Sequence, residues 1–172
     1  LLSFAQIGLI TLVFQCAASL LQPVVGFCTD RRPQPYSLAW GMSITLAGLV
    51  LLSQAGSFYA ILGAAALLGT GSAIFHPEAS RLARLASGGR HGFAQSLFQV
   101  GGNLGSSFGP LLAALLVVPH GQAHILWLSL LALTGIVLLA RVGGWYRRHM
   151  VRRDAGKSAT RAAAVSPLPR RE

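Results

Sequence analysis

The pattern of apolar and polar positions divides most of the chain into five long apolar stretches. These lie near residues 5–25, 38–55, 58–85, 93–118 and 125–140. Each meets or approaches the roughly 20 residues that a helix needs to cross about 30 Å of hydrocarbon. Short connectors rich in Gly, Pro and Ser separate them, and such residues interrupt helices. We therefore predict an all-α integral membrane protein with five transmembrane helices.

Composition supports this fold class and marks a second region. The 172 residues are 53% hydrophobic and only 10% charged, whereas a soluble domain carries about 25% charged residues. After the fifth stretch the sequence mixes Arg, Ala, Ser and Pro with few large apolar residues, a composition that cannot bury enough surface to fold alone. We predict a partial helical bundle over residues 1–141 and a flexible, basic cytoplasmic linker over 142–172, with the lipid bilayer as the surrounding partner.

The basic residues all lie on connectors at one side of the predicted bundle, and the two loops of the opposite side have none. Fourteen Lys and Arg face four acids, a net charge of +10. Arg31 and Arg32 follow the first span, Arg81, Arg84 and Arg90 surround the end of the third, and the other nine follow the fifth. Cytoplasmic loops of membrane proteins collect such residues, so we expect the first residue outside and the tail in the cytoplasm. Nucleic-acid binding predicts a basic face without this asymmetry between loops and is excluded as a partner.

The sequence offers no candidate residues for catalysis or for metal binding. The sequence contains no nucleophile with a base and an orienting group, no phosphate loop and no metal-ligand spacing. Cys16 and Cys28 lie twelve residues apart on one apolar stretch, about 18 Å along a helix. We expect no enzyme activity, no cofactor and no metal. Because Leu1 lies inside an apolar stretch and is not preceded by a Met, we also expect at least one further helix upstream.

A glycine, an acid and a base follow the first span as Gly26, Asp30 and Arg31. This spacing resembles the GxxxDRxGRR loop of the major facilitator superfamily, although Pro33, Gln34 and Pro35 replace its later residues. A carboxylate beside cations at a helix junction can hold two helix bundles together and release them during motion. The resemblance implies a loop gate, and the alternative is a charged turn that only sets topology.

The fourth span carries Gly101, Gly105 and Gly109 at intervals of four, followed by Pro110. Small residues at this interval allow two helices to approach closely, so we predict a tight packing seam here. The segment from Gly105 also resembles GxxxGPxxGG, the antiporter motif of facilitator drug exporters. Two alanines replace its last glycine pair.

Two longer strings strengthen the resemblance and are more specific than the loop motif. They are Phe75-His76-Pro77-Glu78 and Ser87-Gly88-Gly89-Arg90-His91-Gly92. The resemblance implies helices two to six of a twelve-helix facilitator, with the C-terminal half missing. It also implies proton-driven export of small-molecule drugs across a bacterial inner membrane. A membrane protein whose helices only pack, and a facilitator-type metabolite importer, are the alternatives.

Polar side chains form one stripe on each of two spans, at intervals of three or four that place them on one helix face. The stripes are Thr11, Gln15, Ser19 and Gln22, and Gln95, Gln99, Asn103 and Ser106. Amides within a membrane need partners, either in neighbouring helices or in a water-filled cavity. We select Gln15, Gln22, Gln99 and Asn103 as candidates for the substrate pathway, with hydrogen bonding between helices as the alternative.

Glu78 is the only carboxylate within a predicted span. Ionisable groups inside spans are costly and usually mark a function or a partner. His76 adds a second titratable group, and Pro77 removes a backbone donor between them. Three roles stay open for Glu78: an ion pair with Arg81 or Arg31, proton coupling or gating together with His76, and direct contact with substrate.

Overall fold

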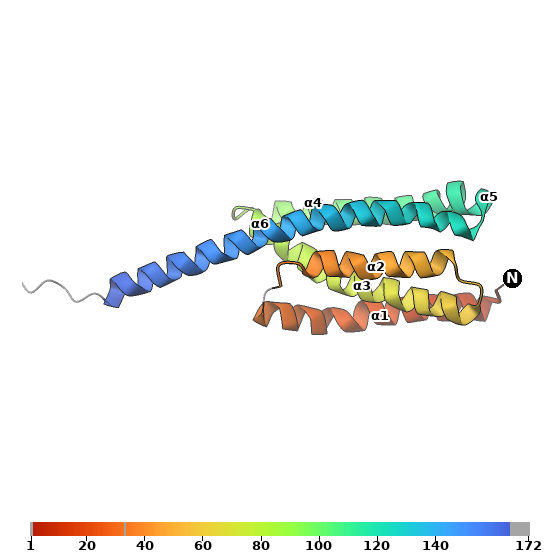
Figure 1. The fold of residues 1–172 in the computed structure, drawn as a ribbon, viewed down its shortest axis with the longest axis horizontal. Coiled ribbons are helices and arrows are strands. Elements are labelled where there is room, and N and C mark those ends of the chain that lie inside the picture. Colours follow the sequence, from red (N-terminus) through yellow and green to blue (C-terminus); the bar gives the residue numbers. More distant parts are fainter. Residues whose placement is uncertain (1, 33, 166–172) are drawn as a thin grey trace, which may run out of the picture.

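The computed structural model of the chain describes residues 2–32 and 34–165, with side chains as far as Val151. Its main helices are α1 (Phe4–Arg31), α2 (Ser37–Ser53), α3 (Phe58–Ala86), α4 (His91–Leu112) and α6 (Ile125–Val165) (Figure 1). Between α4 and α6 lie a π-helical turn η1 (Ala113–Val117), a short helix α5 (Val118–His120) and a 3-10 turn η2 (Gln122–His124). The predicted all-α architecture with five principal helices is confirmed.

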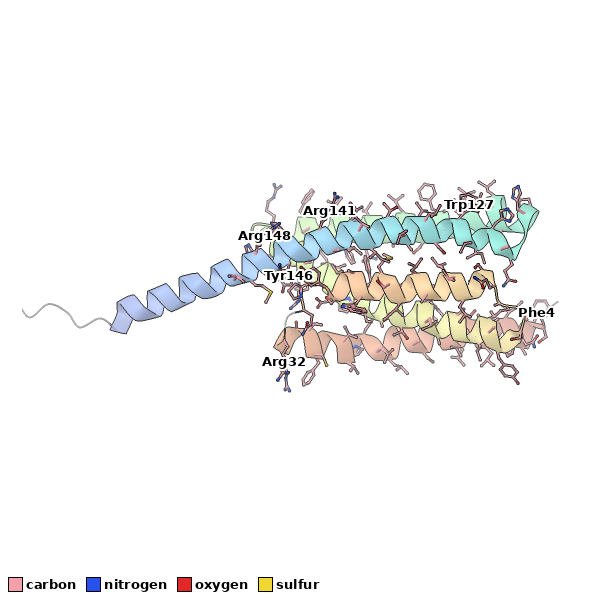
Figure 2. All side chains as sticks on the ribbon, viewed as in Figure 1. Phe4, Arg32, Trp127, Arg141, Tyr146 and Arg148 are labelled. Carbon is pink, nitrogen blue, oxygen red and sulfur yellow. The ribbon has the colours of Figure 1, made fainter. Side chains whose placement is uncertain are left out.

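Four segments are long and apolar enough to cross a membrane. They are Phe4–Arg31, Phe58–Ala86, His91–His120 and Gln122–Val151. The apolar helix α2 has 17 residues, or about 26 Å of helix, slightly less than the roughly 30 Å of hydrocarbon. Large apolar side chains, among them Phe4 and Trp127, lie exposed on the outside of the bundle (Figure 2).

Local signals set the helix boundaries. Ser3 and Gln6 form a reciprocal capping box at the start of α1, and the Ser57 hydroxyl accepts a hydrogen bond from the Ala60 amide at the start of α3. Such side chains satisfy amides that have no partner within the helix. The turn between α3 and α4 uses Gly88 and Gly89 at φ of +58° and +93°, where a Cβ atom would be strained.

Helix α3 is the centre of the bundle. It packs against α1 and α2 along their lengths, whereas α6 packs on α2. The contacts of α3 depend on its small residues: a Cβ added at Gly69 would lie 2.5 Å from the Phe14 carbonyl of α1. On the other side, Gly71 lies against Gly41 and Thr45 of α2. The helices therefore approach until their backbones nearly touch, as membrane helices do.

The packing seam predicted on the fourth span is not formed among the helices that the structure describes, and it stays a prediction. Gly101, Gly105 and Gly109 would each accept a Cβ with nothing within 4 Å, and α4 has no buried residue. Within residues 2–32 and 34–165, the backbone of α4 lies close to α3 and to the following turn η1, but not to α1, α2 or α6. Close glycine contacts lie instead at Gly69 and Gly71 of α3, Gly48 of α2 and Gly143 of α6.

Helix α6 continues through Val165, well beyond the predicted end of the fifth span at residue 140. Ala and Arg favour helix and are frequent in this extension. Its first residues also pack, because Gly143 lies beneath Tyr36 and Tyr146 is buried. The start of the expected linker is thus helical, residues 166–172 lie outside the described part of the chain, and the division into bundle and linker stays a prediction.

We predict that Gly69→Ala lowers the free energy of unfolding by about 1–3 kcal/mol, because the added methyl group meets the Phe14 backbone and the helices must separate. Unfolding of the purified chain in detergent micelles measures this change. Gly105→Ala is the matched control, since its methyl group enters open space. An equal loss in both variants would contradict the assignment of the seam to α3.

Candidate functional site

Glu78 is buried at the crossing of three helices. It lies on α3, where only 4% of its surface is exposed. The N-terminus of α2 places Ser37 opposite, and the Ser37 hydroxyl donates a hydrogen bond of 2.7 Å to Glu78 Oε2. Arg81 lies three residues further along α3 and therefore on the same face. Its Nη2 donates to the same oxygen at 3.1 Å.

Arg81 extends this contact to two further helices. Its Nη1 donates to the Thr29 carbonyl near the end of α1 at 3.1 Å, and its guanidinium lies 5.6 Å from the centroid of the Tyr146 ring on α6. We call Thr29, Ser37, Glu78, Arg81 and Tyr146 the Glu78 network. It joins α1, α2, α3 and α6 at the end of the bundle that carries Arg32 and Arg148 (Figure 2).

The two oxygens of the Glu78 carboxylate differ. Oε2 accepts hydrogen bonds from Ser37 and Arg81, whereas Oε1 is buried without a hydrogen-bond partner. A buried polar atom without a partner carries a desolvation cost, and protonation of a carboxylate supplies a donor at one oxygen. Oε1 is therefore a buried acceptor that no group described in the structure satisfies.

The sequence identified the ion pair but only part of the network. The pair of Glu78 with Arg81, one of the roles left open for this carboxylate, is present, whereas the alternative partner Arg31 places its guanidinium 3.9 Å from the Phe27 ring centroid. Ser37, the Thr29 carbonyl and the packing of Tyr146 were missed. The signal that could have found Ser37 is its place directly after a Pro-Tyr pair, where a helix following the charged loop is expected to begin.

His76 takes no part in the hydrogen bonds around Glu78. Its exposed ring lies 6.1 Å from that of Phe75 and 6.5 Å from that of Phe98 on α4, both edge to face. The structure thus brings His76 against the neighbouring helix instead of the carboxylate. A joint role of His76 and Glu78 stays a prediction.

The four candidates for the substrate pathway are not brought together. Gln15 is exposed and Gln22 half-buried on α1, while Gln99 and Asn103 are exposed on α4. The Gln99 amide donates to Asn103 Oδ1 at 3.4 Å within one helix. Helices α1 and α4 do not touch each other within the described residues, since α3 contacts both. These residues stay predictions.

The loop motif and the antiporter-like motif both lie at the surface of the described chain. Asp30 and Arg31 are exposed, and a Cβ added at Gly26 would meet nothing within 4 Å; Pro33 lies outside the described residues. On α4, Pro110 cannot donate to the carbonyl four residues earlier. The π-helical turn Ala113–Val117 follows shortly afterwards. Neither motif is tested by this geometry.

Comparison with known proteins identifies the class. The family model of the Major Facilitator Superfamily matches residues 2–172, and the chain belongs to this superfamily of multi-pass membrane transporters. The expectation that it is not an enzyme is thereby confirmed. No solved structure matches the chain significantly.

Two curated proteins are similar to most of this chain. The chain is 60% identical over 169 residues to the fosmidomycin resistance protein of Escherichia coli (strain K12), a match that covers 98% of this chain and 41% of that protein. It is 44% identical over 149 residues to the uncharacterized MFS-type transporter YfnC of Bacillus subtilis (strain 168), covering 87% of this chain and 36% of that one. The chain thus spans about two fifths of the length of these relatives.

We predict that Arg81→Gln lowers the free energy of unfolding by about 3–5 kcal/mol, because it leaves the Glu78 carboxylate buried without a counter-ion. Ser37→Ala, which removes one hydrogen bond to a charged group, should cost about 1.5–3 kcal/mol. Unfolding of the purified chain in micelles measures both. Arg84→Gln is the control, since Arg84 is exposed on the same helix and has no ion pair among the described side chains. A loss in the control as large as that of Arg81→Gln would contradict the network.

Proposed function

We propose that this chain forms helices two to six of a twelve-helix facilitator that exports fosmidomycin or similar small molecules, with protons as the coupling ion. The observation that carries this proposal is the 60% identity to the fosmidomycin resistance protein over nearly the whole chain. The antiporter-like pattern of Gly105, Gly109 and Pro110 supports export over import. The rest of the transporter, including its C-terminal half, is the partner that completes the pathway, because facilitator sites lie between two helix bundles.

The proposed orientation places the tail in the cytoplasm of a bacterium and the bundle in its inner membrane. The Arg-rich connectors lie at one end of the bundle, which supports this orientation. We predict that a reporter active only outside the cytoplasm gives a signal when fused near Gly56 or Gly121, and none near Gly88. Expression of each fusion is checked with an antibody. A signal at Gly88 would reverse the topology.

Within this transporter, we assign to Glu78 a role in proton coupling or gating. Three features support it: the carboxylate is buried, its Oε1 has no hydrogen-bond partner, and its Oε2 is held by groups from two helices. Arg81 connects the same carboxylate to the backbone of α1. Neutralisation of Glu78 would weaken the pull on Arg81 and loosen the junction of α1, α2 and α3, which is the kind of local charge change that biases a two-state element.

The test is export by the complete transporter in inverted membrane vesicles. We expect Glu78→Gln to abolish export driven by an imposed pH gradient while downhill movement of substrate persists, because the amide cannot release a proton. Arg81→Gln breaks the same ion pair but leaves the carboxylate, so it should retain gradient-driven export at a lower rate per folded molecule. Wild-type rates with Glu78→Gln would exclude coupling. Equal loss of both modes of transport in both variants would assign the pair a structural role only.

A further inference from the structure

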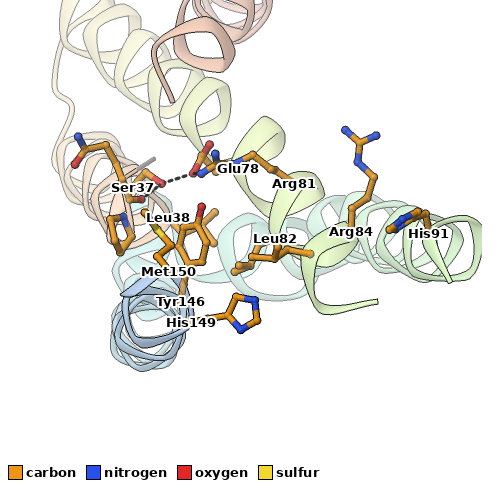
Figure 3. Close-up of a pocket in the computed structure, with 13 residues that line it drawn as sticks. Ser37, Leu38, Glu78, Arg81, Leu82, Arg84, His91, Tyr146, His149 and Met150 are labelled. Atoms are coloured by element: carbon orange, nitrogen blue, oxygen red, sulfur yellow. Dashed lines mark hydrogen bonds and ion pairs between the residues drawn. The ribbon is translucent and has the colours of Figure 1, made fainter. Parts of the chain in front are cut away.

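A pocket of about 580 Å³ opens at the Arg-rich end of the bundle. It lies between α3 and α6, whose backbones stay apart within the described residues although Arg81 reaches the Tyr146 ring, and the N-terminal ends of α2 and α4 contribute to its lining. Part of its wall is apolar, from Leu38, Leu82, Leu85 and Met150. The basic residues of the lining are Arg81, Arg84, His91 and His149 (Figure 3).

The residues that line the pocket carry a net positive charge, because Arg81 and Arg84 outnumber the single acid, Glu78. Glu78 is paired with Arg81, and its Oε1 is buried, so the carboxylate offers little to a ligand. Arg84 is exposed and has no ion pair among the described side chains. Figure 3 places Arg84 and His91 on one side of Leu82, and Ser37 and Tyr146 on the other. The side with Arg84 is thus separated from the carboxylate.

Two helix N-termini add to the positive potential. Helix α2 begins at Ser37 and α4 at His91, and both residues line the pocket. The residues before them, Tyr36 and Arg90, make no capping hydrogen bond through their side chains. The first amides of a helix carry partial positive charge, which favours anions.

We propose that this pocket binds the headgroup of an anionic phospholipid. Arg84 pairs with the lipid phosphate, and the glycerol backbone and the first methylene groups contact Leu82 and Leu85. A free phosphate ion would leave these apolar side chains without a partner, whereas a lipid uses both kinds of surface. Basic pockets between membrane helices at one membrane face bind anionic headgroups in this way. The proposal is independent of whether the protein transports fosmidomycin.

The test counts lipids bound to the full chain. The chain is purified in detergent and mixed with equal amounts of phosphatidylglycerol and phosphatidylcholine, and the bound lipids are measured by native mass spectrometry. We expect a preference for phosphatidylglycerol that falls about fivefold with Arg84→Gln, since one basic residue near an anionic lipid contributes about this factor. Met150→Glu, which places a negative charge in the pocket, should reduce the preference further.

Arg90→Gln is the matched control. It removes the same charge six residues later, from a side chain that lies over the Phe93 ring and does not line the pocket. The preference should survive this change. Equal binding of the two lipids, an equal loss with Arg90→Gln, or complete displacement of phosphatidylglycerol by inorganic phosphate would each overturn the proposal. Size-exclusion profiles confirm that every variant tested remains folded.

Discussion

The ion pair between Glu78 and Arg81 is the contact on which the arrangement of the helices at one end of the bundle depends. A carboxylate in this position is stable only if cationic and hydroxyl groups surround it. Arg81 and Ser37 meet that requirement from two helices, and Arg81 also binds the backbone of α1. One buried charge therefore fixes how α1, α2 and α3 meet.

The small residues of α3 allow α1 and α2 to approach it closely. Gly69 and Gly71 let α1 and α2 approach on opposite sides, and no large side chain in the described part of the chain is fully buried. Membrane helices gain little from burying large apolar groups, because lipid is equally apolar, so close backbone contact and polar pairs define the fold. Close packing at glycines and the buried ion pair therefore both follow from the apolar lipid that surrounds the helices.

The sequence predicted the helices well because each depends on local information. Apolar length, Gly and Pro in the connectors, and the capping Ser57 lie within a few residues of the boundary they set. The pair of Glu78 with Arg81 was also accessible, since their separation of three residues places them on one helix face. Ser37 lies 41 residues from Glu78, and only the packing of α2 on α3 brings it there. The glycine spacing of α4 likewise describes one face of the helix and does not say which helix covers that face.

The length of helix α6 determines how far its end lies from the bundle. Its 41 residues form one helix, about 62 Å long and roughly twice the thickness of the hydrocarbon layer. Its early turns pack on α2, whereas its last turns extend beyond the bundle (Figure 1). From the buried Tyr146 to Val165 the helix extends by about 28 Å along its axis. Any change in the tilt of α6 against α2 would therefore move Val165 in proportion to this distance.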